Sequence, residues 1–185
     1  VHIRSLGPEK FTLPPAGEYR VIQLVPGQIV TEEARATQQE TEALAENDLV
    51  LLAVAERHQG SGRVGLGLLR GLGLNRGAIA ASIAHDSHHV IAAGLDPADL
   101  AAAVEAVAEM QGGLVAVEGG RVLARLALPL AQLKAVEKAA IGLGARTENP
   151  FATLSFMALP VIPAIKITDR GLFDVNQFRP VDLGL

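Results

Sequence analysis

Residues 96–126, DPADLAAAVEAVAEMQGGLVAVEGGRVLARL, decide the fold. Asp96 is a preferred N-cap residue and Pro97 suits the first helical position, so a helix is predicted to begin here. Asp99 in the first turn complements the helix dipole. Apolar residues recur along the stretch at helical spacing. Gly112 and Gly113 permit a left-handed end, so the helix is expected to stop before them.

A hairpin is predicted directly after this helix. Two apolar runs, Leu114 to Glu118 and Arg121 to Leu126, flank Gly119 and Gly120. A two-residue Gly-Gly link between such runs is a strong hairpin signal. A helix followed by antiparallel strands favours an α+β fold with a mixed sheet over a regular βαβ winding.

Further elements are expected on both sides of this stretch. Strands are predicted at Glu18 to Val25, Leu49 to Val54, Val64 to Leu69 and Val90 to Ala93, and a strand or short helix at Ala78 to Ala84. Polar residues 31–48 are expected to form a solvated helix or a surface loop without function. A second helix is predicted over residues 131–143, and the proline-containing tail 151–185 is expected to wrap over the domain in short pieces. The prediction is one compact α+β domain, residues 1–185, with a mixed sheet and hairpins packed against two or more helices.

Composition excludes several classes of protein. The formal net charge is −4 and no basic stripe is present, so no nucleic-acid partner is expected. Glycine, proline or charge interrupts every apolar stretch before the roughly 20 residues of a membrane span, so no membrane role is expected. Cysteine is absent and no signal peptide opens the chain, which fits a cytoplasmic protein. The first residue is not Met, so we expect these residues to come from something longer.

Three of the five histidines lie within residues 84–89, Ala-His-Asp-Ser-His-His. In an extended segment His85, Ser87 and His89 would face one way and Asp86 and His88 the other. A bend could instead bring two imidazoles and a carboxylate together for proton transfer or metal binding. His85 and His88 are therefore weak metal candidates. Two other interpretations of this segment remain. It could be a capped turn whose histidines are packing residues with hydrogen bonds, or it could line a pocket or an interface.

Glu56, Arg57 and His58 form a second candidate group. They follow a predicted buried strand and precede a glycine-rich turn, so they could contact a ligand or form an ion pair within the chain. The glycines between residues 60 and 77 lack the spacing of a dinucleotide-binding loop, and no Gly-Lys-Ser/Thr follows them, so close backbone packing explains them better. No Ser-His-acid triad can be assigned.

Several of these motifs occur in the same order in one known family. They are Glu56-Arg57-His58, GLGLNRGAIA (71–80), AHDSH (84–88), GGL (112–114), LPL (128–130), and NPF followed by LSFMALPVIP (149–163). Together they resemble the C-terminal domain of bacterial adenine deaminase, in the metal-dependent amidohydrolase superfamily, from about Val21 to Asp182. At His89 the family pattern leads us to expect Asn, which removes an amide-specific contact there.

The resemblance implies a function for a larger protein. Enzymes of this family hydrolyse adenine to hypoxanthine and ammonia with a divalent metal, Mn or Fe, held by a (β/α)8 barrel that precedes this domain. The chain lacks a His-x-His barrel motif and is shorter than the about 250 residues such a barrel needs, so alone it is expected to be inactive and to bind no cofactor. No catalytic residue is assigned to it. The expected partners are the barrel of the same enzyme, adenine as substrate of the whole enzyme, and a second copy in a homodimer.

The leading hypothesis is that the domain packs on the barrel and lines or closes the purine site. The substrate-site or interface candidates are Glu56, Arg57, His58, His85, Asp86, Ser87 and His88. The alternatives are a non-catalytic assembly module, with the apolar tail from Phe151 to Ile165 as its contact surface, and an independent metalloenzyme built on the histidines.

Overall fold

Strands and helices alternate irregularly along the chain in a computed structural model that describes residue 3 and residues 6–85, 87–127 and 133–185. In chain order the elements are η1 Pro8–Phe11, β1 Glu18–Leu24, β2 Thr31–Thr37, α1 Gln38–Glu42, β3 Leu49–Ala55, β4 Val64–Arg70, β5 Ala78–Ala81, β6 Val90–Gly94, α2 Pro97–Glu109, β7 Gly113–Glu118, β8 Arg121–Ala127, α3 Leu133–Gly142, α4 Pro150–Met157, β9 Ile165–Thr168, β10 Gly171–Asp174 and β11 Arg179–Pro180.

The main sheet of the described chain has eight strands in the order β2-β1-β4-β3-β6-β5-β7-β8. β1 and β4 run parallel and the other neighbours run antiparallel, so the sheet is mixed, and the predicted α+β class is confirmed. β11, β10 and β9 form a second, smaller sheet.

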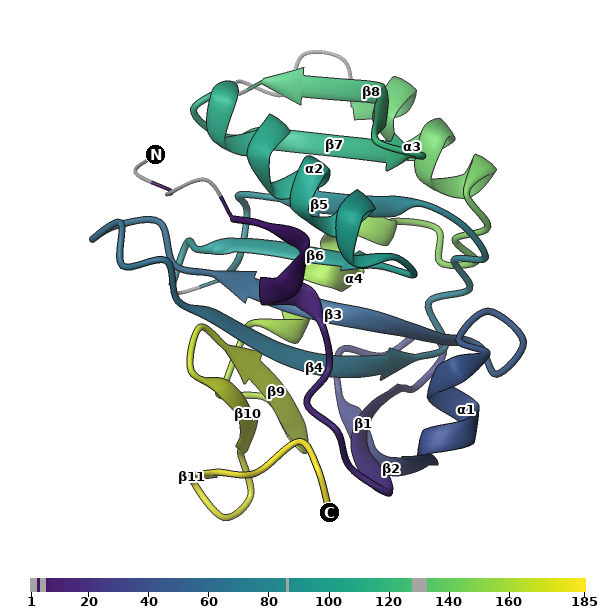
Figure 1. The fold of residues 1–185 in the computed structure, drawn as a ribbon, viewed down its shortest axis with the longest axis vertical. Helices are drawn as coiled ribbons and strands as arrows, with labels where there is room; N and C mark the ends of the chain where they lie inside the picture. Colours follow the sequence, from purple (N-terminus) through teal and green to yellow (C-terminus); the bar gives the residue numbers. More distant parts are fainter. Residues whose placement is uncertain (1–2, 4–5, 86, 128–132) are drawn as a thin grey trace.

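Helices cover both faces of the main sheet (Figure 1). One core packs η1 and α2 on one face, and the other packs α3, α4 and the small sheet on the opposite face. β3 lies between β4 and β6, and all seven of its residues are buried, which explains why its sequence is apolar without alternation. Each buried Leu or Val side chain contributes about 1.5–3 kcal/mol.

The predicted helix and hairpin at residues 96–126 are confirmed as α2, β7 and β8. The Asp96 carboxylate accepts hydrogen bonds from the backbone N–H groups of Ala98 and Asp99, as an N-cap should. The second predicted helix is confirmed as α3 from Leu133, whereas its expected first residues, 131 and 132, lie outside the described part.

The polar segment differs in part from its prediction, whereas the tail consists of short elements as predicted. Residues 31–48, expected as helix or loop, begin with edge strand β2 and continue with the single-turn helix α1. β2 has charged residues exposed to solvent and lacks an apolar alternation, because only one of its edges is paired. The tail contains a regular helix, α4, which Pro150 begins at a position where its missing N–H costs no hydrogen bond.

Strand register brings two loops to one end of the sheet. Ala55 at the end of β3 pairs with Val64 and with Val90, so the β3–β4 loop and the β5–β6 loop leave the sheet side by side. The β9–β10 turn joins them, because a Cβ on Gly65 would lie 1.9 Å from the carbonyl oxygen of Thr168. Only glycine allows this approach. We call this region the histidine end.

Candidate functional site

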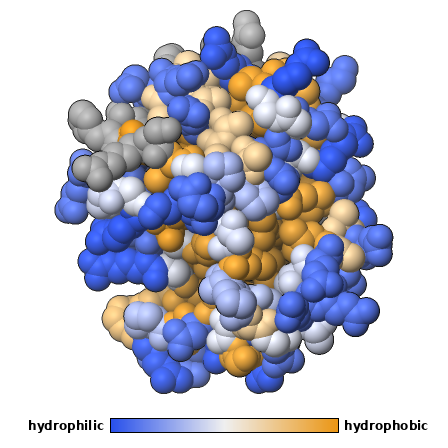
Figure 2. All heavy atoms as spheres, in the orientation of Figure 1, coloured by the Kyte–Doolittle hydropathy of each residue, from blue (hydrophilic) through white to orange (hydrophobic). Residues whose placement is uncertain are grey.

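The histidine end gathers four of the five histidines of the chain: His58, His85, His88 and His89. They lie on the β3–β4 and β5–β6 loops, which project at the left of Figure 1, and Figure 2 shows mainly hydrophilic residues along that edge. The sequence hypothesis that these two loops share one site requires such a juxtaposition. Asp86, one of the candidate residues, lies outside the described residues.

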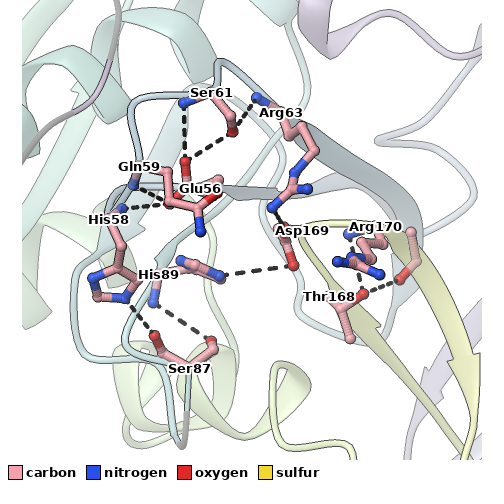
Figure 3. A network of polar contacts seen from close by, with 11 residues as sticks. Glu56, His58, Gln59, Ser61, Arg63, Ser87, His89, Thr168, Asp169 and Arg170 are labelled. Carbon is pink, nitrogen blue, oxygen red and sulfur yellow. Dashed lines mark hydrogen bonds and ion pairs between the residues drawn. The ribbon is translucent and has the colours of Figure 1, made fainter.

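Glu56 is buried, with an exposed fraction of 2%, and its carboxylate turns into its own loop. It accepts hydrogen bonds from the backbone N–H groups of Gln59 at 2.7 Å and Ser61 at 3.1 Å, from the Ser61 hydroxyl at 2.8 Å, and from the N–H of His58 (Figure 3). Burial raises the pKa of this carboxyl, but the hydrogen bonds outweigh burial and lower the pKa to about 2. Glu56 is therefore an ionised anchor for the loop.

His58 ties the two loops together. Its Nε2–H donates to the carbonyl oxygen of Ser87 at 2.9 Å, and its ring lies 5.0 Å from the ring of His89. The Ser87 hydroxyl also lies 3.5 Å from the backbone N–H of His89, a weak contact within the turn. These contacts fix the β5–β6 loop against the β3–β4 loop (Figure 3).

His89 faces the β9–β10 turn. Its Nε2 lies 3.7 Å from the Asp169 carboxylate, which forms an ion pair with Arg63 at 2.9 Å. Burial lowers the pKa of His89, and the negative charge of Asp169 only partly opposes this shift. His89 is consequently a neutral packing residue between two loops and the turn.

His85 contacts helix α4 on the opposite side of the loop. Its Nδ1 lies 2.5 Å from the hydroxyl oxygen of Ser155, and its ring stacks on Phe156 with ring centroids 4.5 Å apart and planes inclined by 14°. Ser155 has an exposed fraction of 1%. The His85 ring is half-buried, and its orientation is set by these two side chains.

Arg57 and His88 are the candidates with no polar side-chain contact to the rest of the described chain. His88 is exposed and has a φ of 49°, a left-handed conformation that is uncommon for a residue with a Cβ. Its backbone N–H donates to the carbonyl oxygen of Ala84 at 2.9 Å, which closes the turn. Arg57 is half-buried, burial lowers the pKa of its guanidinium, and within the described ranges no carboxylate forms an ion pair with it.

A cavity of about 790 Å³ opens on the same side of the sheet as α4. This volume lies within the range of about 300–1,000 Å³ that is typical of small-molecule sites. Phe156 belongs to both sites, since its ring stacks on His85 and also lines the cavity. The other lining residues come from β1 and the β1–β2 turn, the loops before β3 and after β4, the α3–α4 loop, and α4. They are Gln23 to Ile29, Asp48, Gly71, Arg146 to Asn149, Ala152, Thr153 and Met157. The cavity and the histidine end thus meet at α4.

A family model described as the adenine deaminase C-terminal domain matches residues 28–179. The chain belongs to this family. Curated relatives named adenine deaminase include those of Desulfatibacillum aliphaticivorans, 48% identical over 91% of this chain and 32% of the relative, and Archaeoglobus fulgidus, 45% identical over 99% of this chain and 34% of the relative. The relative of Geobacillus kaustophilus is 51% identical over 74% of this chain and 26% of the relative. The chain spans about a third of the length of these relatives or less.

The described part of this adenine deaminase C-terminal domain offers no metal centre. No three His, Asp or Glu side chains converge there as a metal ion would require. His85 and His88 are on one turn, but His85 directs Nδ1 to Ser155 and His88 faces solvent. The described residues therefore do not supply the set of ligands that a divalent metal ion requires. None of the helices in the described ranges is long and apolar enough to cross a membrane.

Three residues of this adenine deaminase C-terminal domain were missed as partners of the candidate site: His89, Ser155 and Asp169. His89 was noted in the histidine cluster and as a departure from the family pattern, but it was not among the candidate residues. Ser155 lies 70 positions from His85 along the chain, and no sequence pattern connects the two. Asp169 occurs in a Thr-Asp-Arg-Gly turn whose composition predicts a turn and nothing more.

Proposed function

We propose that this domain is part of an adenine deaminase that hydrolyses adenine to hypoxanthine and ammonia, and that it packs against a metal-holding barrel and helps to line or close the purine site. The metal, Mn or Fe, would activate water in the barrel. This enzyme would work in the cytoplasm. Membership of the family and the names of the relatives support the reaction.

One observation carries the proposed role of this domain. The histidine end leaves Arg57 and His88, together with Nε2 of His85, without internal polar partners among the described residues, whereas Glu56 and His58 are engaged by their own loops. The hydrogen bonds of Glu56 and His58 hold the two loops in shape, so the remaining groups are presented from a rigid base.

The free groups suit the lining of a polar site. An arginine and two imidazoles can donate hydrogen bonds to the acceptor atoms of a purine. A domain that covers the site would also exclude bulk water, which strengthens these contacts. The role derived for this chain is to orient substrate and to exclude solvent, while the chemical step belongs to the barrel.

The test is substitution in the full-length enzyme. His85→Ala and His88→Ala are expected to lower kcat/KM at least tenfold with the metal content unchanged. Glu105→Ala, an exposed change on α2, is the control and should keep normal turnover. Near-normal turnover of both histidine variants would contradict the proposal that this domain lines or closes the purine site.

A second candidate function, an assembly module, is favoured by a different surface. Val122 and Leu123 on edge strand β8 and Ile141 on α3 are 43%, 49% and 53% exposed. In the tail first considered as a contact surface, Phe151, Leu154 and Met157 pack in the core, whereas Val161 is 65% exposed. Sedimentation of this chain with and without adenine separates the two roles, because only assembly predicts a ligand-independent dimer.

A further inference from the structure

We propose that Ser155 and Phe156 of α4 fix the orientation and tautomer of His85. Its Nε2–H then donates a hydrogen bond to an acceptor atom of a bound ligand, and the ring cannot coordinate a metal ion. That the ligand is a purine rests on the proposed function. The tautomer of His85 does not rest on it, because the tautomer follows from contacts within the described chain.

The hydroxyl of Ser155 lies in a buried, apolar environment, where it requires a hydrogen-bond partner. α4 is apolar along most of its length, and Ser155 lies between buried Leu154 and partly buried Phe156 with an exposed fraction of 1%. A buried hydroxyl without a hydrogen bond is costly. In the described chain its hydrogen-bond partner is Nδ1 of His85, at 2.5 Å.

The direction of this hydrogen bond follows from the inventory of the two groups. A hydroxyl has one donor and two acceptor lone pairs, and a neutral imidazole has one donor and one acceptor nitrogen. An unsatisfied buried donor is rarer than an under-used acceptor. The Ser155 O–H therefore donates to Nδ1, because no other described acceptor is bonded to it. The proton of the neutral ring is then on Nε2.

The stacked ring of Phe156 fixes the plane of the imidazole. The centroid separation of 4.5 Å and the angle of 14° fix the plane of the ring, and the hydrogen bond between Nδ1 and Ser155 selects one of the two orientations that a 180° turn in this plane would exchange. Nε2 has no hydrogen-bond partner among residues that the structure describes, so its N–H is available to a ligand.

The chemistry of the ligand follows from this donor. A metal-bound histidine must offer a lone pair to the metal, but here one nitrogen accepts from Ser155 and the other carries the proton. An acceptor fits instead: an aromatic ring nitrogen or a carbonyl oxygen. Adenine offers the first and hypoxanthine offers both.

Nitrogen-15 NMR of the histidines in this chain tests the tautomer directly. We expect His85 to show the Nε2–H tautomer at neutral pH. Ser155→Ala should raise the Nδ1–H population at least threefold, and Ser155→Thr, which keeps the hydroxyl, should preserve the wild-type pattern. Exposed His88 is the internal control, with the same signals in all three proteins.

Three results would overturn the proposal: an Nδ1–H tautomer in the unmodified chain, an unchanged tautomer in Ser155→Ala, or selective broadening of His85 by one equivalent of Mn²⁺. The spectrum of the unmodified chain decides the tautomer even where Ser155→Ala fails to fold. In the full-length enzyme, Ser155→Ala should lower kcat/KM and Ser155→Thr should restore it. If the tautomer is found as expected but Ser155→Ala and His85→Ala both keep full activity, the ligand role and the proposed function fail, while the fixed tautomer stands.

Discussion

Glu56 stabilises the loop that carries Arg57 and His58, and it does so as a buried anion. Substitution Glu56→Gln keeps the shape of the side chain but leaves one acceptor oxygen for several donors. Hydrogen bonds to a charged group contribute about 1.5–3 kcal/mol each, so we expect the variant to lose about 1–3 kcal/mol of unfolding free energy at pH 7. Denaturant unfolding measures this loss, with exposed Glu32→Gln as the matched control.

The same contribution depends on pH in a defined direction. The pKa of Glu56 is about 2 in the folded chain, against 4.5 for the unperturbed group. A depressed pKa stabilises the fold fully above the unfolded value and loses that effect as the pH falls through the folded value. The difference between the unmodified chain and Glu56→Gln should therefore shrink between pH 4.5 and pH 2. A difference that stays constant over this window would contradict the anchoring role.

The candidate residues could be found from the sequence, but their separate roles could not. Clustered histidines on a predicted loop indicate a site because little stability is gained by placing them there. Which of them face outward depends on contacts between segments far apart in the chain, such as His85 with Ser155 and His89 with Asp169. Local patterns carry no information about such pairs.

Asp99 joins α2 to the β7–β8 hairpin, which makes it the key polar contact between those elements. Its carboxylate accepts hydrogen bonds from the N–H of Gly119 at 3.1 Å and of Gly120 at 2.7 Å. The two glycines have φ angles of 57° and 73°, and this left-handed turn presents both amides to one carboxylate. In the sequence Asp99 was expected only to complement the helix dipole.

Substitution Asp99→Asn tests this contact. The amide group retains one acceptor, so one of the two turn amides loses its partner, and we expect about 1–2 kcal/mol of lost stability. Hydrogen exchange of the Gly119 and Gly120 amides should become about tenfold faster, as a loss of about 1.4 kcal/mol implies. Glu105→Gln, an exposed change on the same helix, should leave both measurements unchanged. Unaltered exchange in Asp99→Asn would show that the turn holds without the carboxylate.

The elements that were predicted correctly have a recognisable local pattern of apolar residues, whereas β2 and α4, which were missed, have none. β3 is a continuous apolar run, and α2 has an N-cap residue followed by an apolar stripe. β2 is an edge strand with solvent-facing charges, and ion pairs such as Arg35 with Glu18 at 3.0 Å take the place of core packing. α4 is apolar on nearly all sides, so its sequence has no helical period to read.

At the scale of the whole molecule, the chain is expected to need its barrel for catalysis. Purified chain with adenine and Mn²⁺ should form no hypoxanthine above the uncatalysed rate, because the described residues bring no metal ligands together. Ultraviolet absorbance and released ammonia give two independent measurements. Turnover that His85→Ala abolishes would instead establish an independent metalloenzyme and refute the dependent-domain proposal.

Comparing hydrogen exchange in this chain and in the full-length protein tests which surface meets the proposed barrel. If the histidine end covers the purine site, amides of the β3–β4 and β5–β6 loops should exchange at least fivefold more slowly in the full-length protein. β2, with its exposed charges, is the internal reference and should not change. Assembly through the exposed apolar residues of β8 and α3 predicts a different pattern: the amides of β8 should exchange more slowly as the protein concentration rises. Because intramolecular packing is independent of concentration, a dilution series distinguishes the two surfaces, and protection confined to β8 would favour assembly over closure of the site.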